Sequence, residues 1–119
     1  MNVNEFLQKY RKLWEGGYNY TRPRVKCVDG FTISVQAGKG LYSDPREDAD
    51  HYTEVELGFP SEVEESLTEY MEDYRRDPRF TVYPYVPAEV VDKILLKHGG
   101  IAGADFSNDK GGVWNESKT

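Results

Sequence analysis

Apolar and polar residues alternate in three segments of the first half of the chain, and this pattern predicts strands. Residues 25–28 form the first segment, and Asp29-Gly30 after it suits the positive φ of a tight hairpin turn. The second segment covers residues 31–37, and the third covers residues 53–59, where glutamates occupy polar positions. The sequence therefore predicts a hairpin followed by a strand with an acidic outer face.

Two segments with the apolar spacing of amphipathic helices flank these strands. The first helix is expected to begin at Asn4 as its N-cap and to end at Gly16-Gly17. The second is expected to begin at Ser61, which forms a capping-box pattern with Glu64, and to end at Asp77-Pro78.

The last part of the chain predicts a short strand and a third helix. Residues 81–86 have strand character, although Pro84 confines such a strand to a sheet edge or a bulge. Pro87 suits the first position of a helix that ends at Gly99-Gly100. Residues 102–119 are rich in Gly, Asn, Asp, Ser and Lys, and we expect them to form a flexible C-terminal tail.

The predicted order, α-β-β-β-α-β-α, is typical of an α+β fold with a small antiparallel sheet of about four strands packed with helices. Residues 1–101 are expected to form a single domain. The inward positions of the predicted elements should share one core: Phe31, Ile33, Val35, Val55, Leu57, Val63, Leu67, Val91, Ile94 and Leu95.

Composition limits the classes of partner. The 119 residues carry a net charge of −6, which argues against direct binding of nucleic acid through its phosphates and favours a basic or nucleic-acid-binding protein as partner. The modest hydrophobic content of 38% leaves room for a homo-oligomer that shares its core. Neither a signal peptide nor an apolar run of about 18 residues is present, so we expect a cytoplasmic protein without membrane contact.

The segment 38–51, between two predicted strands, is the main candidate for function. Loops of about 12–15 residues without secondary structure are uncommon in compact domains and are often functional. Its Tyr42 and Arg46, with Tyr52 just after it, could contact a partner. Five glutamates on the following strand and helix could add an acidic ridge that imitates a phosphate backbone: Glu54, Glu56, Glu65, Glu69 and Glu72.

A second hypothesis assigns the same loop to a small ligand. Lys39, Tyr42 and Arg46 could hold a nucleotide-like signal between protomers of an oligomer, through phosphate contacts and stacking. A charged, solvated loop remains the simpler interpretation of its acidic residues.

No catalytic residue, metal site or cofactor is expected. Cys27 could form a nucleophile pair only if His51 or His98 met it in space, and a lone cysteine is more often a small buried residue. The acidic residues of the loop lack the spacing of a calcium loop, so a solvated surface is favoured over a cation site: Asp44, Glu47, Asp48, Asp50 and His51.

Four runs of the sequence resemble a group of small proteins encoded by tailed phages and prophages. The runs are FTISVQAG (31–38), LYSDPRED (41–48), YTEVELGFP (52–60) and VPAEVVDKILLKHGGI (86–101). The resemblance implies a phage or prophage setting, in which small acidic proteins without catalytic motifs often inhibit host systems such as restriction or CRISPR machinery. The expected function is therefore a non-enzymatic inhibitor of a host or defence protein.

Overall fold

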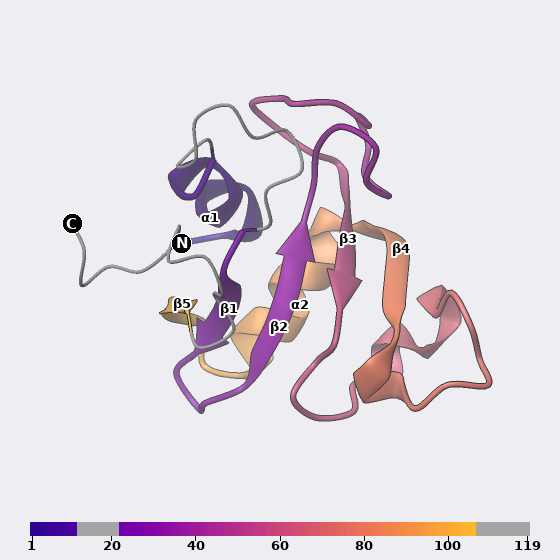
Figure 1. The fold of residues 1–119 in the computed structure, drawn as a ribbon. Coiled ribbons are helices and arrows are strands. Elements are labelled where there is room, and N and C mark those ends of the chain that lie inside the picture. The colour runs from indigo at the N-terminus through magenta and orange to yellow at the C-terminus, as the bar shows by residue number, and fades with distance from the viewer. Residues whose placement is uncertain (12–21, 107–119) are drawn as a thin grey trace.

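The computed structural model describes residues 1–11 and 22–106 (Figure 1). Its centre is a five-stranded antiparallel sheet with the strand order β4-β3-β2-β1-β5. The strands are β1 (Arg24–Cys27), β2 (Thr32–Gln36), β3 (Glu54–Gly58), β4 (Val82–Pro87) and β5 (Ile101–Asp105). The predicted α+β class with a small antiparallel sheet is confirmed, with one strand more than expected.

The turn between β1 and β2 forms as its sequence predicts. Gly30 has a φ of 97°, a conformation that residues with a Cβ rarely adopt. The Asp29 carboxylate accepts a hydrogen bond from the N–H of Phe31 at 2.9 Å, which closes the turn. Val25 is then paired with Ile33 across the hairpin, so both side chains enter the core on the same face of the sheet.

Two α-helices, α1 (Val3–Lys9) and α2 (Ala88–Lys97), complete the core, and α2 crosses behind the sheet (Figure 1). β2 and β3 pair Val35 with Leu57, which directs both side chains toward the helices. Every predicted core residue is buried except Val63, which is 51% exposed. The opposite face of the sheet carries the polar residues of the same strands, as is common for antiparallel sheets.

The predicted helix over residues 61–77 is wrong. The segment forms only the short 3₁₀ helix η1 (Glu65–Tyr70), and a second one, η2 (Pro78–Phe80), follows it. Instead of capping a helix, Ser61 accepts a hydrogen bond from the N–H of Thr32 and donates its own N–H to the carbonyl of Thr32. Glu64 is buried in a tertiary contact, so the two residues of the expected capping box are both used elsewhere.

The predicted start of the first helix is also wrong by two residues. Asn2 is the N-cap, and it forms a reciprocal capping box with Glu5. The side chain of Asn4 instead forms two hydrogen bonds with the backbone of Tyr52, at 2.8 and 3.0 Å. The predicted end of this helix at Gly16-Gly17 lies outside the described residues.

The ordered sheet extends into the segment that was predicted to be a tail. β5 pairs with β1, with Arg24 opposite Asp105 and Lys26 opposite Gly103. Its small residues give no alternating pattern, so only the pairing with β1 reveals the strand. Residues 107–119 lie outside the described part of the chain. Among the residues that the structure describes, no helix is long and apolar enough to cross a membrane.

Candidate functional site

A bulge in β4 presents an aromatic residue on the face of the sheet that the helices leave open. Val55 is opposite Val86 and Leu57 is opposite Tyr83, so two residues of β4 face one residue of β3. Tyr85 lies in this bulge with a φ of 53° and a 38% exposed side chain. A positive φ costs a bulky residue about 1–3 kcal/mol, and such conformations concentrate at functional sites.

Tyr42, in the loop that joins β2 to β3, packs against this bulge. The Tyr85 N–H donates to the carbonyl oxygen of Tyr42 at 3.1 Å, and the two rings lie 5.7 Å apart. The Tyr42 N–H donates to a carboxylate oxygen of Glu56 at 3.1 Å, and hydrogen bonding to Glu72 raises the pKa of the Tyr42 hydroxyl. We call the group formed by Tyr42, Tyr85, Arg46, Glu56 and Glu72 the Tyr42–Tyr85 platform.

Arg46 belongs to the platform through its own loop. Its guanidinium lies 5.4 Å from the centroid of the Tyr42 ring and donates to the carbonyl oxygens of Leu41 and Gly40 at 3.1 and 3.3 Å. Lys39 is exposed at the tip of the loop. The Gly38 N–H, which an anion-binding loop would need, donates instead to the hydroxyl of Ser43 at 3.1 Å. Arg46 and Gly38 therefore stabilise the loop itself.

Tyr52, which was expected to contact a partner, has a fully buried side chain. Its hydroxyl donates to the carbonyl of Glu47 and accepts from the N–H of Ala49, both at 2.9 Å. Together with Asn4, these bonds fix the second half of the loop against α1. This half is packed structure, whereas the half that contains Tyr42 faces the open side of the sheet.

Two of the acidic residues of the loop, Asp48 and Asp50, form ion pairs with Arg11, and a third, Asp44, accepts a hydrogen bond. Arg11 at the end of α1 contacts Asp48 at 2.9 Å and Asp50 at 2.5 Å, and these bonds raise the pKa of its guanidinium. Asp44 accepts a hydrogen bond from the hydroxyl of Thr53 at 2.8 Å. The cluster therefore docks the loop onto α1.

The predicted glutamates separate into two groups. Glu54 and Glu56 alternate with core residues of β3, so they lie on the open face of the sheet, and Glu56 joins the platform with Glu72. Glu65 and Glu69 are exposed on η1, which packs against β4. The interactions that form the platform do not include Glu65 or Glu69, so the acidic ridge of all five glutamates stays a prediction.

A buried ionic cluster, which the sequence did not indicate, lies at the other end of the sheet. His98 follows α2 and is 4% exposed. Its Nδ1 lies 2.7 Å from a carboxylate oxygen of Asp29, and its Nε2 lies 2.5 Å from one of Glu64. The ring stacks on Phe31 with a centroid distance of 3.9 Å, and the Lys97 ammonium contacts Glu64 at 3.1 Å.

Glu62, Glu64 and His98 are close enough together to be considered as metal ligands. The ring geometry does not favour this, because the two nitrogens of an imidazole point in opposite directions. Glu64 is 2.5 Å from Nε2, which leaves no space for an ion between them, and Glu62 is 4.0 Å from Nδ1 on the other side. The arrangement fits a protonated imidazole between carboxylates.

Cys27 is buried on β1 beside α2. Burial, and to a lesser degree the charge of Asp29, raises the pKa of its thiol to about 11, and its Sγ lies 3.8 Å from the carbonyl oxygen of Leu95. Both ring nitrogens of His98 are directed at carboxylates, and His51 is exposed on the loop beside α1. The arrangement gives the thiol no general base, so it does not favour the Cys–His hypothesis.

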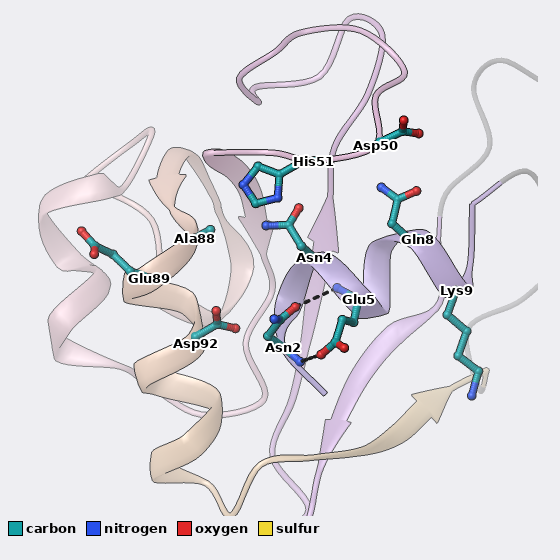
Figure 2. A pocket seen from close by; sticks show the side chains of 10 residues that line it. All are labelled: Asn2, Asn4, Glu5, Gln8, Lys9, Asp50, His51, Ala88, Glu89 and Asp92. Carbon is teal, nitrogen blue, oxygen red and sulfur yellow. Dashed lines mark hydrogen bonds between the residues drawn. The ribbon is translucent and has the colours of Figure 1, made fainter.

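An open pocket of about 780 Å³ lies between α1, the N-terminal end of α2 and the end of the loop. Figure 2 shows the side chains that line it. Its polar lining is largely used by the fold. Asp92 accepts a hydrogen bond from the N–H of Val3 at 2.8 Å, and Glu5 accepts one from the N–H of Asn2 at 2.7 Å. Gln8 donates a hydrogen bond to the carbonyl oxygen of Ala49 at 3.0 Å. These bonds hold α1, α2 and the loop together.

Comparison of the chain with protein-family models, curated proteins and solved structures gives no match. The similarity to phage and prophage proteins therefore stays a prediction from the sequence.

Proposed function

We propose that this chain is a non-enzymatic binding protein whose Tyr42–Tyr85 platform contacts a basic partner protein. The observation that carries the proposal is the positive φ of Tyr85, which is held in a bulge with its ring against Tyr42. A strained, half-exposed aromatic residue has no evident value for the core, because the core lies on the other face of the sheet. Tyrosine and arginine are also the residue types that most often dominate binding energy at protein interfaces.

The charge of the partner follows from the surroundings of the platform. Glu56 and Glu72 flank Tyr42, and Glu54 lies on the same face of β3 as Glu56. Arg46, the cation of the platform, is directed at the carbonyls of its own loop. The group thus presents more negative than positive charge, which steers a basic surface toward it. The phage or prophage setting, and inhibition of a host or defence protein as the outcome of binding, rest on the sequence resemblance.

The alternative function, capture of a nucleotide signal by Lys39, Tyr42 and Arg46, needs a different loop conformation. Arg46 would have to release the carbonyls of Leu41 and Gly40 to reach a phosphate. The glutamates beside Tyr42 would also repel an anion. The observed contacts therefore favour the protein partner.

Affinity capture from the host lysate tests the proposed face. We expect the wild-type chain to retain a basic protein that a Tyr42→Ala, Tyr85→Ala double variant does not retain. Leu96→Ala is the matched control, since Leu96 is 75% exposed on α2, away from the open face of the sheet. Equal capture by the double variant and the wild-type chain would place the contact elsewhere.

The rate of association with the captured protein tests the charge of the partner. We expect this rate to fall between low and physiological salt, because exposed charges are screened within about 8–10 Å at physiological ionic strength. Glu54→Lys should also lower it, since Glu54 lies on the open face of β3 together with Glu56. If the rate responds neither to salt nor to this charge reversal, the partner is not recognised through its positive charge. The platform would still be the proposed contact surface.

A further inference from the structure

We propose that His98 is a proton-controlled latch that ties the β1–β2 turn and the segment 59–64, with η1 after it, to the C-terminal end of α2. The inference stands on the buried cluster and does not use the Tyr42–Tyr85 platform. Three segments far apart in the sequence meet at this single imidazole. Asp29 comes from the turn, Glu64 from the segment before η1, and His98 from the end of α2.

The latch depends on the number of N–H donors in the ring. An imidazolium has two donors, whereas a neutral imidazole has one donor and one lone pair. Carboxylates lie within hydrogen-bond distance of both nitrogens, so only the cation satisfies Asp29 and Glu64 together. After loss of the proton, one of these two carboxylates faces a lone pair.

The two carboxylates differ in their access to water. The Asp29 side chain is 49% exposed and can turn to solvent, whereas that of Glu64 is 2% exposed and cannot. We therefore expect a neutral His98 to keep its donor toward Glu64 and to release Asp29. Glu64 would then keep only the largely exposed ammonium of Lys97, 3.1 Å away, as a positively charged partner, and burying a less well compensated carboxylate is costly.

Four charged groups face His98. The carboxylates of Asp29 from the β1–β2 turn and of Glu62 and Glu64 from the segment 59–64 favour its protonation, whereas the ammonium of Lys97 on α2 opposes it. Burial by itself would lower the pKa of His98, but hydrogen bonds and charges of Asp29 and Glu64 raise it above the ordinary 6.5. The hydrogen bond from the N–H of Phe31, and then the hydrogen bond and charge of His98, lower the pKa of Asp29.

The sign of the pH dependence follows from these directions. A raised pKa of His98 in the folded state means that its stabilising contribution is complete below pH 6.5 and is lost as the pH rises through the folded value. The backbone of Glu64 also accepts the N–H of Leu67 at the start of η1, so loosening of Glu64 should reach η1 directly.

A titration of the histidine side chains by NMR tests the latch, first in the wild-type chain and then in two variants. The chain contains only two histidines, and the exposed His51 outside the cluster serves as the internal reference. We expect His98 to keep its proton above pH 6.5 in the wild-type chain. Glu64→Gln should lower the midpoint for His98 clearly, and Glu62→Gln, 4.0 Å from the ring, should change it less. A wild-type midpoint below 6.5 would overturn the latch.

Hydrogen exchange as a function of pH tests its structural consequence. After correction for the intrinsic rate, protection of the Leu67 amide should fall with rising pH by about tenfold for each pH unit that separates the folded and unfolded pKa values of His98. The Glu64→Gln variant is the control: without this carboxylate, protection at Leu67 should depend less on pH than it does in the wild-type chain. Protection at Leu67 that stays constant through the His98 midpoint would contradict the proposal. Neither measurement involves a partner, so failure of the latch and failure of the proposed function remain distinguishable.

Discussion

The backbone N–H of Tyr85 donates a hydrogen bond to the carbonyl oxygen of Tyr42 at 3.1 Å, and this bond joins the bulge of β4 to the long loop. Tyr85 can direct its N–H to the loop because the bulge takes it out of register with β3. The contact also brings the two rings to 5.7 Å. One backbone irregularity thus determines the position of both aromatic side chains.

A double-mutant cycle measures the contact between these rings. Tyr42→Ala and Tyr85→Ala leave both backbone partners of the hydrogen bond intact and remove only the side chains. We expect a coupling free energy of about 0.5–1.5 kcal/mol between them in urea unfolding, as for other aromatic pairs. The Tyr42→Ala, Leu96→Ala pair should be additive, because Leu96 lies on α2. A coupling of zero for the tyrosine pair would show that the platform is not a packed unit.

Tyr52→Phe tests whether the second half of the loop is structural. The substitution removes the hydroxyl that bonds the carbonyl of Glu47 and the N–H of Ala49, and it leaves the buried ring in place. We expect a loss of about 1–3 kcal/mol in the free energy of unfolding, since buried backbone groups lose their partner. Capture of a partner should be unchanged below the melting transition. A neutral effect on stability would mean that water replaces the hydroxyl.

Gly99 and Gly100 offer a matched test of a close contact. Both have a positive φ, 92° and 88°, so alanine introduces similar backbone strain at each. A Cβ at Gly99 would lie 2.8 Å from the Cβ of Val28, whereas nothing lies within 4 Å of one at Gly100. We expect Gly100→Ala to cost about 1–2 kcal/mol from strain alone, and Gly99→Ala to cost more. An equal loss of stability in the two variants, measured by thermal unfolding, would show that the turn at Val28 moves to make room for the added Cβ.

Cys27 should be unreactive in the folded protein. Burial raises the pKa of its thiol from 9.0 to about 11, which lowers the thiolate fraction at pH 8 by roughly a hundredfold. Reaction with an aromatic disulfide reagent should therefore be slow in buffer and fast in guanidinium chloride. Equally fast reaction in both conditions would contradict the burial of this side chain.

The elements that depend on neighbouring residues were determined by the sequence alone. Alternation over residues 31–37 and 53–59 predicted β2 and β3, and the spacing of residues 87–98 predicted α2. Asp29-Gly30 predicted the hairpin turn. Each of these signals is local: side chains two residues apart share a face of a strand, and a glycine adopts a positive φ wherever it stands.

The roles of the polar residues were decided only by the tertiary structure. Asn4 forms a hydrogen bond with Tyr52, 48 positions away in the sequence. Glu64 and Asp29 both contact His98, which is 34 and 69 positions away from them. Periodicity carries no information about such partners. The sequence therefore predicted that Asn4 and Ser61 cap helices, whereas in the structure they form hydrogen bonds with distant residues. β5 likewise has no pattern of its own and exists because β1 offers an unpaired edge. Local sequence determines which faces are apolar, whereas a polar group takes whichever partner the folded chain brings to it, because burial leaves no water to replace that partner.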